Sequence, residues 1–240
     1  MMRLAHATAC VCLLGTATLA AAQAQPHASE WASYRDAYRS VVVFEKYGGP
    51  KSLLQNHVQL VPREPGALRA ALDDAPRMGL QLVLSGKTVQ TSLALDPLGR
   101  GVLPLVKAAY DENAVLAPSR RIGPFSLRSR VTIAAQADNT YDSAELRAAC
   151  EQALGFARHI DATARSRQCV GVRMVFPKKG VETSVKLRRA EGEQPLPVAP
   201  GPAFGGDMDA DFPSATYRFG PERAQVITFS APLAIVPLFE

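Results

Sequence analysis

The chain has 240 residues with 27 basic and 22 acidic side chains, and its net charge of +5 is dispersed along the sequence. A dispersed charge of this size is typical of a solvated surface, and it excludes the dense basic patch of a nucleic-acid-binding protein. After the N-terminal residues no apolar run approaches the roughly 20 residues of a membrane span, so we expect no transmembrane segment once the leader is removed.

The first 22 residues have the pattern of a secretory signal peptide. Arg3 provides a basic start, residues 9–22 are almost all apolar or small, and a polar stretch begins at Gln23. This order is typical of a cleaved leader, so we predict a signal peptide at 1–22 and a periplasmic or secreted protein. Lipidation at Cys10 is the alternative, but too few residues separate Arg3 from Cys10 for an apolar region.

The cysteines support this compartment. Cleavage would remove Cys10 and Cys12 and leave Cys150 and Cys169. An even pair in an oxidising compartment favours a disulfide. Because no Cys-X-X-Cys motif is present, we predict a structural bridge without a redox role.

A helix is expected first in the remaining chain, within residues 26–46, where aromatic and apolar residues recur at helical spacing from Trp31 onward. The glycine- and proline-containing residues 47–50 would end it. A short alternating strand follows at 57–61. We assign 26–78 to an N-terminal helix and linker region.

The clearest strand pattern lies at 79–105. Every second residue from Leu80 to Leu84 is leucine, a tight turn follows, and a second alternating run leads to the turn sequence at 96–99. A third strand is expected at 102–105, which would complete a three-stranded meander.

The rest of the central region, 79–191, alternates strands with one helix. Strands are predicted at 125–134, 170–176 and 181–187. Between the first two lies a helix at 142–160.

This helix carries three consistent signals. Asp142 is a suitable N-cap, and a glutamate three residues later would complete a capping box. An apolar stripe includes Leu146, Leu154 and Ile160, and we expect that stripe to pack on the sheet.

The proline- and glycine-rich stretch 192–206 is predicted to be an extended loop, and 207–240 to supply C-terminal strands that complete the sheet. These elements predict a β-rich α+β fold: an antiparallel β-sandwich-like body with one main amphipathic helix packed on the sheet.

One short motif suggests a metal. Asp207, Asp209 and Asp211 have the spacing of the first ligands of a calcium loop. The later positions disagree, because Phe212 stands where the loop requires glycine and Arg218 where it requires glutamate. The triplet is therefore a weak calcium candidate, and a solvated acidic face is the simpler interpretation.

No catalytic or cofactor-binding residue can be assigned. The histidines outside the leader, His27, His57 and His159, lie far from other metal ligands in the sequence, and no nucleophile or phosphate-binding motif occurs. Arg128 and Arg130 would project together from the polar face of their strand. They form a possible anion-binding face, although a plain exposed sheet face is the default for such alternation.

Three segments resemble a family of exported Gram-negative proteins that has no assigned activity: 44–50, 95–116 and 146–158. The meander at 80–105 also resembles transthyretin-like β-modules. Neither resemblance implies a functional residue.

These features lead to two functional hypotheses. The first is an exported, non-enzymatic binding or structural protein of the cell envelope, whose partner is an envelope polymer or another envelope protein. The alternative is a periplasmic hydrolase whose acidic residues converge only in the folded chain. A deep cleft with two carboxylates would favour the hydrolase, and an exposed strand edge or apolar surface would favour the binding protein.

Overall fold

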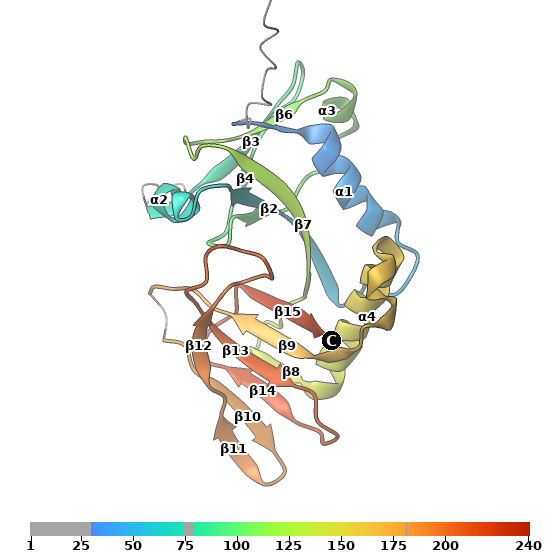
Figure 1. Cartoon of the computed structure of the whole chain (residues 1–240), viewed down its shortest axis with the longest axis vertical. Helices are drawn as coiled ribbons and strands as arrows, with labels where there is room; N and C mark the ends of the chain where they lie inside the picture. Colours follow the sequence, from blue (N-terminus) through green and yellow to red (C-terminus); the bar gives the residue numbers. More distant parts are fainter. Residues whose placement is uncertain (1–29, 74–78, 181) are drawn as a thin grey trace, which may run out of the picture.

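The computed structural model describes residues 30–73, 79–180 and 182–240. The predicted signal peptide at 1–22, with Cys10 and Cys12, lies outside the described residues, as does His27. Within the described part, three antiparallel sheets and four α-helices form a β-rich body (Figure 1), which confirms the predicted fold class.

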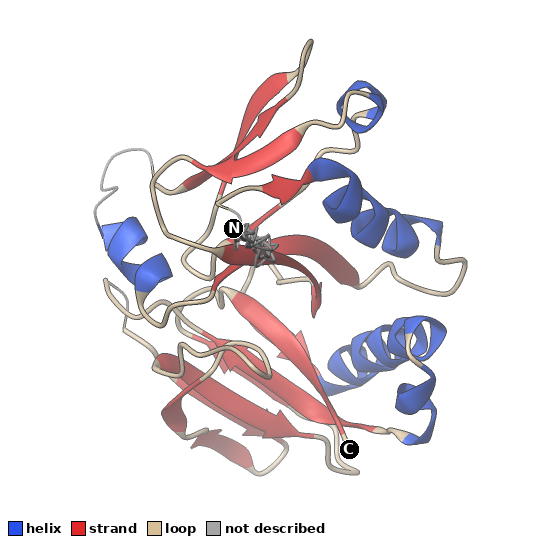
Figure 2. Ribbon diagram, turned by 45° about the horizontal axis from the view of Figure 1, so that its top comes forward, coloured by secondary structure: helices blue, strands red, loops and turns tan. Residues whose placement is uncertain are grey.

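The helices differ greatly in length. They are α1 (Tyr34–Lys46), α2 (Ala67–Asp73), α3 (Lys107–Asp111) and α4 (Ser143–Ile160), with a 3₁₀ turn (Ala162–Ser166) after the last. Helices α1 and α4 lie on the same side of the molecule, one above the other in Figure 2. Helix α1 contacts β2 and β7, whereas α4 packs mainly on β9 and also reaches β7 and β15.

The strands form one long sheet and two shorter ones. The long sheet has the order β12 (Val198–Gly201), β13 (Phe212–Arg218), β9 (Cys169–Val175), β15 (Ala234–Phe239), β7 (Phe125–Ile133), β2 (Leu54–Pro62), β5 (Arg100–Gly101). One short sheet is β1 (Ala32–Ser33), β6 (Val115–Pro118), β3 (Gln81–Ser85), β4 (Gln90–Ala94). The other is β11 (Gly192–Pro195), β10 (Val185–Arg189), β14 (Gln225–Thr228), β8 (Thr140–Asp142).

Helix α1 begins later than its sequence pattern predicts. Ser33 caps it by accepting a hydrogen bond from the backbone N–H of Asp36 (3.4 Å), so the helix starts at Tyr34. Tyr34 is buried, and its hydroxyl donates to the carbonyl oxygen of Pro104 (2.6 Å). Trp31, expected on the apolar face of the helix, lies before the cap and is 52% exposed.

The first two strands of the predicted meander are confirmed. Strands β3 and β4 pair antiparallel, with Leu82 opposite Leu93. The alternating leucines Leu80, Leu82 and Leu84 are buried against α1 and β6, as the period of two requires.

The prediction of a third meander strand at 102–105 is wrong. Residues 102–105 form no strand, and Arg100 begins β5, which pairs with β2 in the long sheet. The turn causes this change of direction. The carboxylate of Asp96 accepts a hydrogen bond from the backbone N–H of Arg100 (2.9 Å), and Gly99 adopts φ +72°. The carbonyl oxygen of Gly99 then accepts the N–H of Leu60 (2.9 Å), which draws the chain to β2.

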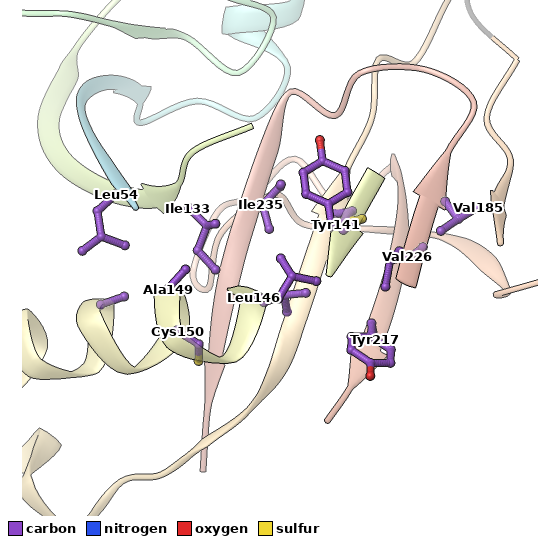
Figure 3. Packing of buried hydrophobic residues seen from close by; sticks show 14 of the residues in the cluster. Leu54, Ile133, Tyr141, Leu146, Ala149, Cys150, Val185, Tyr217, Val226 and Ile235 are labelled. Carbon is purple, nitrogen blue, oxygen red and sulfur yellow. The ribbon is translucent and has the colours of Figure 1, made fainter. Parts of the chain in front are cut away.

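Helix α4 matches its prediction except for two features, the capping box and the C-terminal end of the apolar stripe. Asp142 caps the helix through its carboxylate (2.8 Å), but Glu145 bonds a glutamine before the helix instead of completing a capping box. Leu146 and Leu154 are buried (Figure 3 shows the first of them against the strands). Ile160 is 56% exposed, so its predicted packing on the sheet is wrong.

The disulfide prediction is supported by geometry. Cys150 on α4 and Cys169 at the start of β9 are at bonding distance, with their Cα atoms 6.0 Å apart. The pair connects the buried face of the helix to the long sheet. Cys150 is itself fully buried among the apolar residues of this half of the molecule.

The predicted loop at 192–206 is instead largely strand. Its first part forms β11, which pairs with β10, and its second part forms β12 at the edge of the long sheet. Ala203 and Phe204 at its end are buried. The proline-rich composition is compatible with this structure because both strands lie at sheet edges, where a missing N–H is tolerated.

The C-terminal strands join different sheets. Strand β13 pairs with β9, whereas β14 pairs with β10 and β8. The last strand, β15, lies between β9 and β7 in the long sheet. The strand expected at 181–187 begins at Val185, and residue 181 lies outside the described residues.

Candidate functional site

The three aspartates of the weak calcium candidate contact cationic side chains. Asp207 Oδ1 lies 2.7 Å from Arg130 Nη2, and Asp209 Oδ1 lies 2.6 Å from Lys178 Nζ. Asp211 contacts the same lysine. In the part of the chain that the structure describes, no three carboxylate, imidazole or thiol groups gather as a metal site would require. The triplet therefore anchors its loop to β7 and to the segment after β9.

The last two aspartates of the triplet, Asp209 and Asp211, influence each other. Burial raises the pKa of Asp209, and its hydrogen bond to Asp211 acts in the same direction. Hydrogen bonds with Asp209 and Lys178 hold the pKa of Asp211 well below its usual range. Asp211 also pairs with Arg69 of α2 at 2.9 Å, which connects this loop to the helix.

The two arginines of the predicted anion-binding face have different environments. Arg128 is exposed. Arg130 is half-buried; its Nε donates to Gln59 Oε1 (2.6 Å), and its guanidinium lies 4.6 Å from the centre of the Phe204 ring. Its ion pair with Asp207 is largely withdrawn from solvent, with side-chain exposures of 16% and 9%. Burial lowers the pKa of Arg130, and the charge of Asp207 opposes this effect.

A second buried arginine lies beside the first. Arg100 donates two hydrogen bonds to the carboxylate of Asp96 (2.9 and 2.7 Å) and a third to the carbonyl oxygen of Leu233 before β15. The side chain of Arg100 is 5% exposed. Since each arginine faces one carboxylate, this cluster is charge-balanced and holds segments together that are distant in the sequence.

The described histidines do not complete a catalytic group. His57 is half-buried on β2; burial lowers its pKa, and the charge of Arg100 adds to the effect. Its Nδ1 finds no hydrogen-bond partner within the described residues. His159 lies at the other side of the molecule, on the exposed end of α4 beside Tyr47.

A concave surface lies between α1 and α4. It is a groove of about 620 Å³, and its floor is formed by the facing edges of β7 and β15. We call it the split-sheet groove. Its size falls within the range of about 300–1,000 Å³ that is usual for ligand clefts.

The walls of the split-sheet groove are mainly apolar. Val43 of α1 and Ile160 of α4 face it, and both are exposed, at 41% and 56%. The charged residues that line it are Arg130 and Arg167, and no carboxylate of the described residues does so. The remaining lining residues are Ser40, Ser129, Val131, Ala153, Phe156, Ala157, Phe204, Gly205, Val236, Pro237 and Phe239.

A proline explains why the sheet opens here. Strands β7 and β15 pair only at Ile133 and Ile235, and they then diverge, as Figure 1 shows. In the same register the next hydrogen-bonded pair would join Val131 to Pro237. Proline has no N–H to donate, so one of the two hydrogen bonds of that pair cannot form and the ladder is weakened at that point. The exposed last turn of α4 lies over this opening, which accounts for the exposure of Ile160.

The sequence patterns did not identify the groove. Its residues come from α1, α4, β7, the 204–205 loop and β15, which are widely separated along the chain. Pro237 within the final apolar segment was the one available local signal, because proline in a strand marks an edge. Its partner on β7 can be found only from the fold.

In comparisons with protein-family models, with curated proteins and with solved structures, nothing matches this chain. None of the helices in the described ranges is long and apolar enough to cross a membrane.

Proposed function

We propose that this protein is an exported, non-enzymatic binding protein of the cell envelope that holds an apolar ligand in the split-sheet groove. The observation that carries the proposal is the groove itself, an open and mainly apolar surface between α1 and α4. The two helices stay apart because each packs mainly on a different core. Exposed apolar surface of this kind commonly marks a binding site.

Two further observations support the proposal. The carboxylates of the best-buried polar cluster, Asp96 and Asp207, are each engaged by an arginine. The hollow that includes His159 is lined by Arg39 and Lys46 but by no described carboxylate. The hydrolase considered from the sequence would instead need acidic side chains that converge in one cleft and can exchange protons there.

The N-terminal pattern and the bonded cysteine pair support export. A disulfide is stable in the periplasm or outside the cell and is rare in a reducing cytosol. N-terminal sequencing of the protein from its native host is expected to begin near Gln23 or Gln25. Recovery of the intact chain from the cytoplasm would contradict the proposed location.

Dye binding tests the groove directly. Anilinonaphthalenesulfonate, an apolar anion, is expected to fluoresce on binding the purified protein. Ala157→Glu places a carboxylate in the apolar wall and should weaken this binding at least about tenfold, because it repels the anionic dye and removes apolar surface from the site. Ala148→Glu makes the same change on the exposed face of α4 and should leave binding unaltered. Equal binding by both variants would exclude the groove as the site.

A further inference from the structure

One edge of β7 carries backbone groups that no strand uses. The N–H of Ala134 donates to Leu53, and the N–H of Arg63 donates to Pro124, so the even-numbered residues of β7 direct their N–H and C=O groups toward β2. The odd-numbered residues direct theirs to the other side, into the split-sheet groove.

Ser129 and Val131 are the residues concerned. Both line the groove, and Ser129 is exposed. Within residues 30–73, 79–180 and 182–240, their backbone N–H and C=O groups have no hydrogen-bond partner, because β15 has turned away after Ile235. They form a short strand edge that is ready to pair.

The opposite edge of the groove is less suited to pairing. The backbone N–H and C=O groups of Ala234, Val236 and Leu238 are directed to β9, so those of Ile235 and Pro237 are directed to the side of β7 and the groove. Pro237 presents a carbonyl oxygen there but no donor. A segment entering the groove would therefore pair with β7, and β15 would act mainly as a wall.

The charges of the lining point to an acidic ligand. Arg167 lines the groove just after the 3₁₀ turn that follows α4, and the neighbouring hollow, which shares Val43 with it, carries Arg39 and Lys46. No described carboxylate lines either surface. An apolar segment with an acidic residue would complement this distribution.

We infer that the split-sheet groove, taken as the binding site of the proposed function, holds an extended peptide segment of a partner protein. The segment adds as a strand to the β7 edge at Ser129 and Val131. Alternate apolar side chains lie between Val43 and Ile160, and a carboxylate meets Arg167. This is strand addition, in which the backbone supplies affinity and alternating pockets supply selectivity.

A lipid chain would match the apolar walls less completely. It would cover the N–H and C=O groups of Ser129 and Val131 and remove them from water without replacing their hydrogen bonds. Burying such groups without partners is unfavourable. A peptide satisfies them, and for this reason the structure favours a peptide.

The test uses a fluorescein-labelled peptide in which valine and serine alternate between terminal aspartates, long enough to cover residues 127–131. It is expected to bind the purified protein and to displace anilinonaphthalenesulfonate. Two versions carry N-methyl groups on opposite alternate sets of residues. The version methylated on the edge that faces β7 should bind about 30-fold more weakly, because two backbone hydrogen bonds are lost. The other version should bind almost as the unmodified peptide does.

A protein variant checks the same contact. Ser129→Pro removes the N–H that faces the groove and the side-chain hydrogen bond from Ser129 Oγ to Asn56 Oδ1 (2.8 Å), but it leaves the backbone hydrogen bonds to β2 in place, since those come from even-numbered residues. It should weaken peptide binding about tenfold while the dye still binds, which shows that the fold is retained.

The outcomes separate the two proposals. Equal binding of both methylated peptides, or dye displacement by palmitate and not by the peptide, would overturn the strand-addition inference and leave the groove as a binding site. A dye that binds Ala157→Glu as well as the unmodified protein would overturn the proposed function as well.

Discussion

Arg130 connects parts of the chain that are far apart in sequence. It extends from β7 to Asp207 in the loop before β13, to Gln59 on β2, and to the ring of Phe204. A partly buried charge of this kind is tolerated because Nε donates to Gln59 and Nη2 donates to the carboxylate of Asp207. Its role in the structure is to fix the 204–207 loop against β7, at one end of the split-sheet groove.

Removing Arg130 should therefore be costly. Arg130→Met leaves Asp207 largely buried without its partner, and we expect the free energy of unfolding to fall by about 3–5 kcal/mol in urea denaturation. Adding Asp207→Leu should restore much of the loss, because the unpaired charge is then absent. Arg128→Met, on the exposed neighbour, should change stability by less than about 0.5 kcal/mol. Equal losses in the free energy of unfolding from Arg130→Met and Arg128→Met would contradict the role of Arg130 in fixing the 204–207 loop.

His57 gives the molecule a pH dependence. Burial and the charge of Arg100 lower its pKa in the folded state below the ordinary value of 6.5. Between these two values the unfolded chain binds more protons than the folded chain, so stability rises with pH across that window and is lost as pH falls through it. His57→Gln should flatten this part of the stability profile, measured by urea unfolding at several pH values. An unchanged slope would show that His57 does not contribute.

Helix α4 is held to the long sheet by a covalent bond as well as by packing. The bridge between Cys150 and Cys169 closes a short loop, with a sequence separation of 19. In the chain-entropy model such a loop stabilises the fold by about 3 kcal/mol, because it restricts the unfolded chain. Without the bridge, α4 would be held by its apolar contacts and by hydrogen bonds such as the one from the Ala224 N–H to Ser143 Oγ (3.0 Å).

The double variant Cys150→Ser with Cys169→Ser should lose about 3 kcal/mol in the free energy of unfolding. Adding a thiol reductant should lower the stability of the unmodified protein by a similar amount and leave the variant unaffected. Dye binding should persist in both, since the bridge lies outside the groove lining. A reductant that does not alter the stability of the unmodified protein would contradict a structural bridge.

Local signals were sufficient for some elements and insufficient for others. The cap and stripe of α4 and the leucine alternation of the β3–β4 hairpin depend on neighbours in the sequence, and both were predicted. The strand at Arg100 depends on β2, forty residues earlier, and the strands within 192–206 depend on edges supplied by other segments. Propensity alone could not place them, because strand pairing is decided by tertiary context.

The candidate site shows the same limit. The spacing of Asp207, Asp209 and Asp211 was visible in the sequence, but their partners Arg130 and Lys178 were not. Local spacing suggested a weak calcium candidate or, more simply, a solvated acidic face, whereas the folded chain supplies cationic partners from β7 and from the segment after β9. A linear motif gives the type of ligand atoms, and the fold decides what they contact.

The described residues form two large apolar cores joined by the long sheet, together with a smaller cluster around Phe204. One core gathers α1, β3, β4 and β6, the other gathers α4, β9 and the C-terminal strands, and β2 and β7 extend across both. Between them β7 and β15 meet at a single residue pair. The split-sheet groove is therefore the place where the two halves of the molecule are least joined, and Pro237 keeps them apart.

Pro237→Val should close the groove. Valine supplies the missing N–H opposite Val131, so the β7–β15 ladder can extend and the free energy of unfolding should rise by about 1 kcal/mol. In the unmodified protein the amides of Ser129 and Val131 should exchange hydrogen faster than those of Arg128 and Arg130, which bond to β2. In the variant that alternation should disappear and dye binding should fall.

Pro195→Val provides the matched control, since it makes the same change on the exposed edge strand β11. It should leave both the exchange pattern of β7 and dye binding unchanged. If the Pro237 variant retains the alternating exchange and binds dye normally, the missing donor is not what holds the sheet open. The packing of α1 and α4 on separate cores would then have to account for the division, and the groove would persist whatever residue occupied position 237.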